Sequence, residues 1–211
     1  MILYGSSLSP FVRKTLAYAS EKGIALELKA INPGAEDPEF REASPFGRIP
    51  GFRDGDFAIS DSTAIITYLE AKFPEPPLIP LDPKSRARVI WYEEFADTIL
   101  VGKLAPIFFN RVVAKLFGRE GDLALADKLE SEELPPLLDY LEKTVPASGF
   151  LVDDRLTLAD LAVASVFVNM SHAKVEIVAE RHPKAAAYIE TILARPSFAP
   201  IIASEKAFLN R

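Results

Sequence analysis

The first 75 residues alternate short apolar runs with stretches in which apolar residues recur at helical spacing. Apolar runs bounded by turn residues predict strands, and the 3.6-residue spacing predicts helices. The Asp54-Gly55 pair lies between apolar residues and predicts a hairpin turn. The expected elements are a strand at 2–4, a helix at 10–22, a strand at 25–31, a short helix within 32–40, a hairpin within 47–60 and a helix at 61–73. This β-α-β-α-β-β-α order predicts a small α/β domain with helices on the faces of its sheet.

Residues 74–83 contain five prolines, a density that excludes a helix or a central strand. We therefore expect a linker there, between an α/β domain at 1–75 and a second domain at 84–211. The second domain shows only helical patterns. They comprise a long run at 86–117 with an expected bend at Pro106, an amphipathic stretch at 122–145 interrupted by Pro135 and Pro136, an apolar helix at 158–170 and a helix at 185–194.

The composition excludes several classes of function. A net charge of -6 and a pI near 5.1 argue against a nucleic-acid binder. The apolar stretch at 100–117 carries charged residues and is not expected to span a membrane, and the chain start lacks the pattern of a signal peptide, which favours the cytoplasm. The chain has no cysteine and only two histidines, so it has no cysteine nucleophile and little material for a metal site; no metal is expected.

Three short motifs of the first domain are candidates for a binding site. Ser9 precedes Pro10 at a predicted helix start, where free backbone N–H groups and the helix dipole favour an anion. Ile49-Pro50 precedes a short strand, and a cis proline there would leave the main chain of Ile49 free to pair with an extended peptide. Asp61-Ser62 starts another helix and could bind an ammonium and a carboxylate group. Each motif also has a plainer interpretation, as a helix cap or as a trans proline in an ordinary turn.

The order of these motifs resembles that of the cytosolic glutathione transferases over nearly the whole chain. The matching stretches are SPFVRK, GRIPGF and DSTAIITYL in the first domain, and LTLADLAVAS and YIETILARPSF in the second. The Ser-Pro-Phe arrangement is most similar to bacterial, serine-type members, closest in motif to the tau class. The resemblance implies a thioredoxin-like N-terminal domain followed by an all-helical domain. It also implies a cis Pro50 and the conjugation of glutathione to small apolar electrophiles.

The resemblance also implies roles for individual residues. Ser9 would donate a hydrogen bond to the thiolate of glutathione, with Ser7 as the main rival and Ser6 third. Ile49 and Pro50 would contact the cysteinyl unit, and Asp61 and Ser62 would hold the γ-glutamyl group. The remaining expected contacts are Phe11 and Arg48 with glutathione, Arg41 as a weaker partner for its glycine carboxylate, and Leu8, Phe108, Phe109 and Val112 with the electrophile.

Several alternatives remain open at the level of sequence. The chain could be a non-catalytic binding or regulatory module with the same fold, or could use the thiolate for dehalogenation, ether cleavage or peroxide reduction. Phe108 and Phe109 could be plain core residues, and Arg48 a solvated surface charge. Thr157 and Asp160 fit a helix capping box and are assigned no chemistry. His172 ends an apolar helix, and His182 is expected to cap a helix or face solvent. The family is usually a two-fold homodimer.

Overall fold

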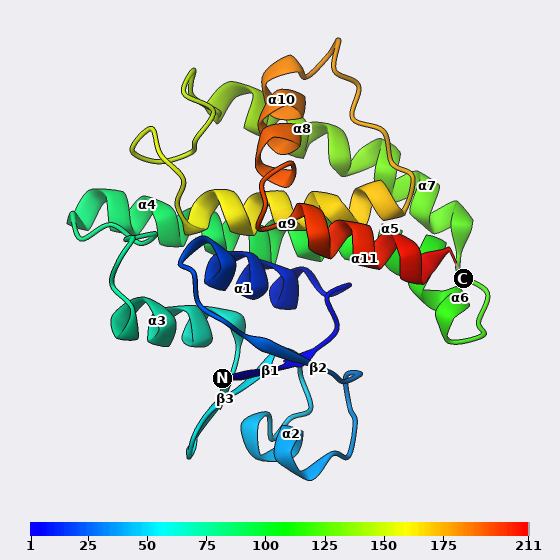
Figure 1. Cartoon of the computed structure of the whole chain (residues 1–211). Coiled ribbons are helices and arrows are strands. Elements are labelled where there is room, and N and C mark those ends of the chain that lie inside the picture. The colour runs from blue at the N-terminus through cyan, green and yellow to red at the C-terminus, as the bar shows by residue number, and fades with distance from the viewer. Residues whose placement is uncertain (211) are drawn as a thin grey trace. The chain divides into compact units, whose positions relative to one another are not determined.

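The computed structural model describes residues 1–210, which form two compact units (Figure 1). The first unit contains residues 1–79 and 196–210, and the second unit contains residues 80–195. Each unit is built around its own core. The first is an α/β structure and the second is helical.

The first unit is built on a four-stranded sheet in the order β2-β1-β3-β4. Its strands are β1 (Ile2–Gly5), β2 (Glu27–Ala30), β3 (Gly51–Asp54) and β4 (Phe57–Ser60). Strands β1 and β2 are parallel, whereas β3 is antiparallel to both β1 and β4. The predicted β-α-β-α-β-β-α order is confirmed.

Three helices cover this sheet: α1 (Pro10–Glu21), α2 (Pro38–Ala43) and α3 (Ser62–Lys72). Helices α1 and α3 pack together on one face, and α2 lies on the other (Figure 1). The core follows the alternation of the strands, so that Leu3 faces one side and Tyr4 the other. Tyr4 is fully buried against Phe40 and Ala43.

The last helix, α11 (Ala199–Leu209), belongs to the first unit, whereas the sequence pattern assigned everything from 84 to 211 to the helical domain. A fully buried ion pair holds it there. Arg13 of α1 donates from Nε and Nη2 to the two carboxylate oxygens of Glu205, each at 3.0 Å. Ser197, just before α11, donates to Glu21 at 2.6 Å. The partners of the ion pair are 192 positions apart, a separation that no local pattern reveals.

The proline-rich linker is anchored to the first unit by Glu70 of α3. One carboxylate oxygen of Glu70 accepts from the backbone N–H groups of Leu78 and Ile79, at 3.1 and 3.0 Å. The other accepts from Lys22 Nζ at 2.5 Å and from the Tyr18 hydroxyl. Burial, followed by the bond to Glu70, raises the pKa of Tyr18. Hydrogen bonds to Glu70 therefore hold the predicted linker against the first unit as far as Ile79, where this part of the unit ends.

The second unit begins with a helical run from Pro83 to Leu116 that continues through Pro106. It consists of α4 (Pro83–Glu94), η1 (Phe95–Leu100), α5 (Val101–Phe108), η2 (Phe109–Val113) and α6 (Ala114–Leu116). The segments η1 and η2 are π-helical, a local widening that admits an extra residue per turn. Proline lacks the N–H that a helix interior requires. The helix nevertheless continues past Pro106 and becomes π-helical from Phe109, where η2 begins. There the Asn110 side chain donates to the Pro106 carbonyl at 2.9 Å.

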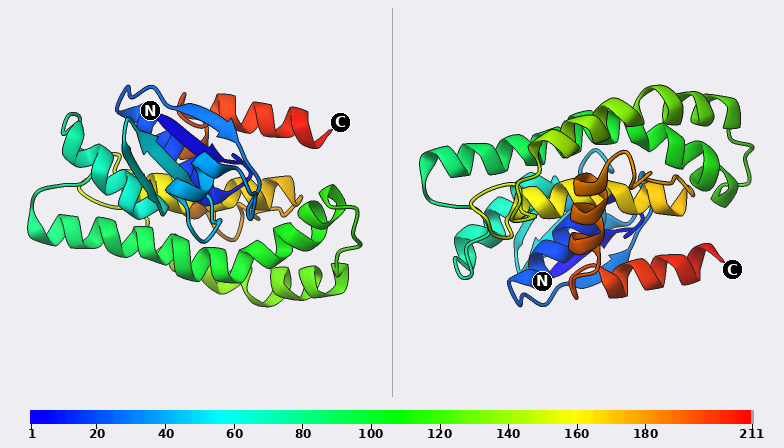
Figure 2. Two further views of the ribbon diagram at one scale, coloured as in Figure 1. Left: turned by 90° about the horizontal axis from the view of Figure 1, so that it is seen from below. Right: turned by 90° about the horizontal axis from the view of Figure 1, so that it is seen from above.

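The rest of the second unit surrounds one buried helix. The further helices are α7 (Leu123–Glu132), α8 (Leu134–Thr144), α9 (Leu158–His172) and α10 (Pro183–Leu193). Every residue of α9 from Leu158 to Met170 is buried, and α9 packs against α4, α5 and α10 (Figure 2). The predicted central helix is thus confirmed. Across residues 1–210, helices that combine the length and apolarity needed to span a bilayer are absent.

The predicted capping box at the start of α9 is also present. Asp160 accepts from the backbone N–H groups of Leu151 and Thr157, each at 2.9 Å, and from the Thr157 hydroxyl at 3.2 Å. Burial raises the pKa of the Asp160 carboxyl to about 6, although the hydrogen bonds from Leu151 and Thr157 oppose the shift. Through Asp160, these hydrogen bonds attach the loop that precedes α9 to the first turn of the helix.

Candidate functional site

A pocket of about 410 Å³ lies at one edge of the sheet of the first unit. Strand register explains its position. Tyr4 pairs with Gly51, and Gly51 pairs with Ser60. The residues that follow β1, precede β3 and follow β4 therefore meet at the same end of the strands. We call this the Ser9 pocket. It is lined by Ser9, Phe11, Pro33, Arg48, Ile49, Pro50, Ser60, Asp61 and Ser62.

Ser9 occupies the N-cap position of α1, but its side chain does not cap the helix. Pro10 takes the first helical position, and the Ser9 carbonyl accepts from Arg13 N at 2.9 Å. The Ser9 amide donates to Ser6 O at 3.0 Å, which holds the loop in a tight turn. Among residues 1–210 the Ser9 hydroxyl has no hydrogen-bond partner. The plain capping interpretation is therefore not realised, and the hydroxyl is available to a ligand at a helix N-terminus.

Ser7 and Leu8 lie on the other side of this loop. Together with Ser6 they line a different pocket of the first unit, which we call the Ser7 pocket. Of the three candidate hydroxyls, the structure thus brings only Ser9 together with Ile49 and Asp61.

The Ile49–Pro50 peptide bond is cis, as the resemblance implied. Ladder pairing of β3 starts at Gly51, so Ile49 lies outside the sheet. Within the described chain the backbone N–H and C=O of Ile49 form no hydrogen bond. The preceding turn is fixed by Ser44, whose hydroxyl donates to the Arg48 carbonyl at 2.6 Å. Ile49 therefore presents a free donor and a free acceptor in the manner of an unpaired strand residue.

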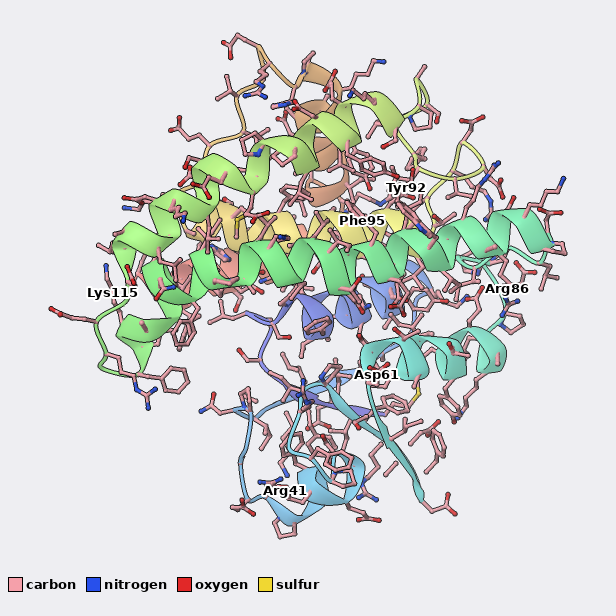
Figure 3. The ribbon with its side chains drawn as sticks, turned by 180° about the vertical axis from the view of Figure 1, so that it is seen from behind. Arg41, Asp61, Arg86, Tyr92, Phe95 and Lys115 are labelled. Atoms are coloured by element: carbon pink, nitrogen blue, oxygen red, sulfur yellow. The ribbon has the colours of Figure 1, made fainter. Side chains whose placement is uncertain are left out.

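Asp61, rather than Ser62, caps α3. Its Oδ1 accepts from the backbone N–H groups of Thr63 and Ala64, at 2.9 and 3.1 Å, and Figure 3 shows Asp61 at the start of this helix. Asp61 has a φ of 82°, a conformation that Asp and Asn adopt more readily than most residues. Its second carboxylate oxygen makes no hydrogen bond to residues 1–210. Ser62 is buried, and its hydroxyl likewise has no partner in the part of the chain that is described. The pair thus offers one acceptor and one donor.

Of the two arginines considered as partners for a carboxylate, Arg48 has a free guanidinium within the described chain and Arg41 does not. Arg48 is exposed, lines the Ser9 pocket and makes no ion pair with the described residues. Arg41 of α2 (Figure 3) donates to the Ala35 and Gly34 carbonyls and to Glu36, at 2.9, 3.1 and 2.6 Å. These bonds tie down the loop before α2. Arg41 therefore acts as a structural residue, which argues against its expected role toward a carboxylate.

Pro33 and Ser60 also line the Ser9 pocket, although no sequence motif singles them out. Ser60 ends β4 directly before Asp61, and Pro33 follows β2. Their contribution depends on strand register, which local motifs do not contain. The hydroxyl of Ser60 is a further uncommitted donor of this pocket within residues 1–210.

The residues expected to contact the electrophile are spread over both units. Leu8 lines the Ser7 pocket of the first unit. In the second unit, Phe108 is buried and its ring centroid lies 6.4 Å from that of His172, Phe109 is exposed, and Val112 lines a pocket with Arg111 and Lys115. For Phe108 the plain-core alternative agrees with its burial. The role of these four residues toward an electrophile remains a prediction.

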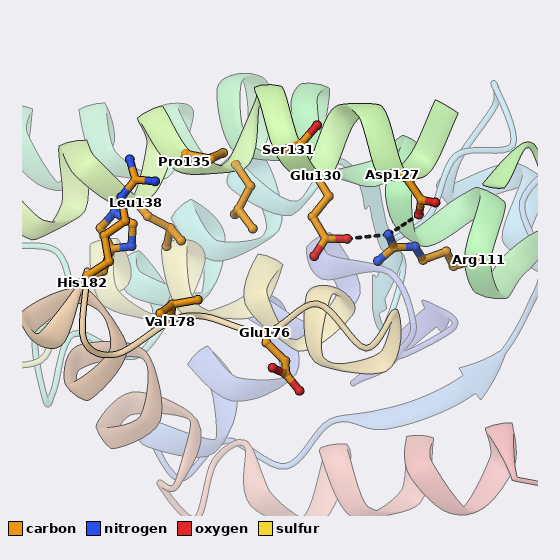
Figure 4. A pocket seen from close by; sticks show the side chains of 11 residues that line it. Arg111, Asp127, Glu130, Ser131, Pro135, Leu138, Glu176, Val178 and His182 are labelled. Atoms are coloured by element: carbon orange, nitrogen blue, oxygen red, sulfur yellow. Dashed lines mark hydrogen bonds and ion pairs between the residues drawn. The ribbon is translucent and has the colours of Figure 1, made fainter. Parts of the chain in front are cut away.

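A pocket of about 360 Å³ in the second unit is lined by charged residues, most of which form ion pairs (Figure 4). Arg111 pairs with Glu130 and, at 2.6 Å, with Asp127. His182 occupies the N-cap position of α10, one of its two expected roles, but its side chain makes no cap bond. It does not face solvent, since it is only 3% exposed, and its Nε2 lies 2.7 Å from Asp139 Oδ1. The hydrogen bond from His182, together with the charge of Arg181, holds the pKa of Asp139 below its usual value. We assign these groups a structural role.

Comparison with known proteins agrees with this architecture of a thioredoxin-like α/β domain joined to an all-helical domain. Residues 3–77 match the glutathione S-transferase N-terminal domain, and residues 108–205 match the glutathione S-transferase C-terminal domain. A glutathione S-transferase from Hyoscyamus muticus is 30% identical over 207 residues, covering 96% of this chain and 97% of the relative. The chain belongs to the glutathione S-transferase family and is an enzyme of that family.

Solved structures show the same fold. A glutathione S-transferase from Rhodospirillum rubrum superposes with a TM-score of 0.86 at 25% identity, covering 95% of this chain and 90% of that chain. Glutathione S-transferase I from maize, solved with an atrazine–glutathione conjugate, superposes with a TM-score of 0.84 at 27% identity, and the match covers 96% of each chain. The thioredoxin-like fold and the helical domain predicted from the sequence are therefore confirmed.

Proposed function

We propose that this enzyme is a serine-type glutathione transferase that adds the glutathione thiolate to small apolar electrophiles. The observation that carries this proposal is the convergence of Ser9, Ile49, Asp61 and Ser62 on one pocket with uncommitted hydrogen-bonding groups. Glutathione (γ-Glu-Cys-Gly) brings a thiol, an ammonium, two carboxylates and an extended backbone. Each of these groups has a matching partner in the Ser9 pocket.

The roles follow from this chemistry. The free oxygen of Asp61 accepts from the γ-glutamyl ammonium, while the hydroxyl and backbone N–H of Ser62, at the start of α3, bind its carboxylate. The backbone of Ile49 pairs with the cysteinyl unit. Arg48 reaches the glycine carboxylate, and Phe11 packs beside the bound tripeptide. The glutathione conjugate bound by the maize relative supports this use of the pocket.

Ser9 acts as a hydrogen-bond donor to the thiolate. A free thiol has a pKa near about 8.5, so only roughly 3% is ionised at pH 7. Lowering that pKa by about two units requires roughly 2.7 kcal/mol of differential stabilisation. A hydroxyl bonded to a charged group supplies about 1.5–3 kcal/mol, and a helix N-terminus about 0.3–1 kcal/mol. Together they suffice without a general base.

Ser9→Ala is expected to raise the thiol pKa of bound glutathione by roughly 1–2 units, because the thiolate loses its hydroxyl donor. Ultraviolet thiolate absorbance of the complex, titrated against pH, measures this directly. Ser7→Ala is the matched control, since its hydroxyl lines the Ser7 pocket, and it should leave the titration unchanged. A shift in Ser7→Ala alone would assign the donor to Ser7, and an unshifted thiol pKa in the wild type would refute the mechanism.

Ser62→Ala is expected to weaken glutathione binding by roughly 1–3 kcal/mol, because a buried charged acceptor loses its donor. Asp61→Asn should weaken it as well. Asparagine keeps the N-cap and tolerates the positive φ, so this variant removes only the charge. Calorimetric titration gives both affinities, and thermal unfolding of the ligand-free variants should match the wild type. Unchanged affinity in both variants would place the γ-glutamyl group elsewhere.

We also propose a two-fold homodimer, in which the first unit of one subunit faces the helices of the other. Large apolar side chains are exposed on each unit. Phe46, in the turn before β3, is 89% exposed, and Trp91 of α4 is also exposed. Such residues are enriched at the buried centre of protein interfaces.

A further inference from the structure

The pocket of about 360 Å³ in the second unit shares no residue with the Ser9 pocket, and we call it the His182 pocket (Figure 4). Its walls come mainly from α7, α8 and the segment 173–182, which joins α9 to α10. Backbone hydrogen bonds hold this segment, since the N–H groups of Arg181 and His182 both donate to the Val178 carbonyl, at 3.1 and 3.0 Å. The cavity is therefore built into the fold, and its volume falls within the usual range of small-molecule sites.

Negative charge is in excess at one end of the His182 pocket. Arg111 is shared by Asp127 and Glu130, so this group of three side chains carries a net negative charge. Glu176 also lines the pocket, is exposed and forms no ion pair with the part of the chain that the structure describes. An ammonium group at this end would be attracted by the unpaired carboxylate, whereas an anion would be repelled.

The other end of the pocket offers a hydrogen-bond acceptor. The hydrogen bond from His182 holds the pKa of Asp139 below its usual value, so the Asp139 carboxylate is ionised and can only accept. The hydrogen is therefore on Nε2 of His182, and Nδ1 of the neutral ring is an acceptor. Within residues 1–210 this buried Nδ1 has no hydrogen-bond partner. Asp139 also pairs with Arg181 at 3.3 Å, which leaves no net charge here, so a hydroxyl donor suits Nδ1 better than an ammonium.

An apolar surface separates these two ends. Figure 4 shows Leu138 and Val178 between His182 and Glu176. Leu138 belongs to the buried core, whereas Val178 is 54% exposed, and Leu134 continues the same wall. The pocket thus presents a neutral acceptor, an apolar surface and an excess of negative charge, in that order. Apolar walls with a few polar groups are typical of sites that bind small organic molecules.

We propose that the His182 pocket is a second ligand site, which binds primary amines that carry a hydroxyl group at the far end of an apolar body. The ammonium lies at Glu176, the apolar body covers Leu138 and Val178, and the hydroxyl donates to Nδ1 of His182. Hydroxyphenyl-alkylamines have these three parts in this order. The site is independent of the function proposed for the Ser9 pocket, and it binds its amine whether or not glutathione is bound.

The test is calorimetric titration of the full-length enzyme with four probes that differ in one group each. Tyramine carries both polar groups, phenethylamine lacks the hydroxyl, tyrosol has a hydroxyl in place of the ammonium, and phloretate has a carboxylate there. Tyramine should bind at least about fivefold more tightly than phenethylamine or tyrosol, and phloretate should bind most weakly. Saturation with S-methylglutathione should leave the affinity for tyramine unchanged. This control is needed because Asp61 of the Ser9 pocket also has a free carboxylate oxygen within residues 1–210.

Glu176→Gln should weaken the binding of tyramine about fivefold or more and leave that of tyrosol unchanged, because only the ammonium contacts the carboxylate. Glu180→Gln is the matched control. Glu180 is an exposed glutamate of the same segment that does not line the pocket, and its substitution removes the same charge. His182→Phe should abolish the preference for tyramine over phenethylamine; if this variant does not fold, the wild-type comparison of the two probes still tests the hydroxyl contact.

Three results would overturn the proposal. Equal binding of tyramine and tyrosol by the wild type would show that the ammonium is not recognised. Equal effects of Glu176→Gln and Glu180→Gln on tyramine would mean that the attraction comes from the overall charge of the protein. Competition between tyramine and S-methylglutathione would place the amine in the Ser9 pocket.

Discussion

Glu70→Ala is expected to lower the free energy of unfolding by about 3–5 kcal/mol, the usual cost of removing one partner from a buried ion pair. The Lys22 side chain is fully buried, and Glu70 Oε2 lies 2.5 Å from its Nζ. The same carboxylate accepts from Tyr18 and from the backbone N–H groups of Leu78 and Ile79. Truncation thus leaves the Lys22 ammonium without its counter-ion, with only the Pro76 carbonyl at 2.7 Å as acceptor, and leaves the backbone donors of Leu78 and Ile79 unpaired. Chemical denaturation followed by circular dichroism measures the loss.

Two further variants identify the cause. Glu190→Ala removes an exposed helical glutamate and should change stability by no more than about 0.5 kcal/mol. Lys22→Met in the Glu70→Ala background removes the unpaired charge and should restore part of the stability. A Glu70→Ala protein as stable as Glu190→Ala would show that the network contributes little. No restoration by Lys22→Met would show that the backbone donors, rather than the charge, dominate.

Asp160 is expected to make stability depend on pH between about pH 4 and pH 7. Burial raises its pKa to about 6 in the folded chain, from 3.8 for the unperturbed group. The folded state therefore holds a proton that the unfolded state has released, and the contribution of Asp160 to stability falls as pH rises through this interval. The shift corresponds to about 3 kcal/mol.

The measurement compares the wild type with Asp160→Asn, which does not titrate. The difference in free energy of unfolding, wild type minus variant, should decrease by roughly 2–2.5 kcal/mol from pH 4 to pH 7, most of the full shift, because all other titrations are shared. Thr157→Ala should cost about 0.5–2 kcal/mol through loss of the cap and should leave the kinetics of the folded enzyme unchanged. A wild-type-minus-variant difference that stays constant with pH would mean that Asp160 titrates normally.

The features that could be predicted from the sequence are those determined by a few neighbouring residues. Pro10 after Ser9, the prolines of the linker and the Thr157 to Asp160 box each specify local geometry, and the structure reproduces them. The shared pocket of Ser9, Ile49 and Asp61 followed from their order in a family-like α/β domain. Strand register then supplies the physical reason, since it aligns the ends of β1, β3 and β4.

The features that were missed depend on contacts between distant positions. Helix α11 was not among the expected elements, and its place in the first unit depends on Glu205 meeting Arg13, a contact that no local pattern contains. The hydrogen bonds of Arg41 could not be predicted for a related reason: a charged side chain looks free until the carbonyls around it are located. Ser7 and Ser9 are two residues apart, and only the turn between them separates their pockets.

The return of the chain to the first unit has a consequence for biosynthesis. Residues 1–79 are translated before the second unit, yet their α1 carries a buried guanidinium whose partner, Glu205, is translated only after that unit. Domains often fold as they are synthesised, but contacts of long sequence separation must wait for the distant segment. The intervening helical unit can reach its native packing while the nascent α/β unit still lacks its final helix. A chain that ended at residue 195 would contain the whole second unit and an unfinished first one.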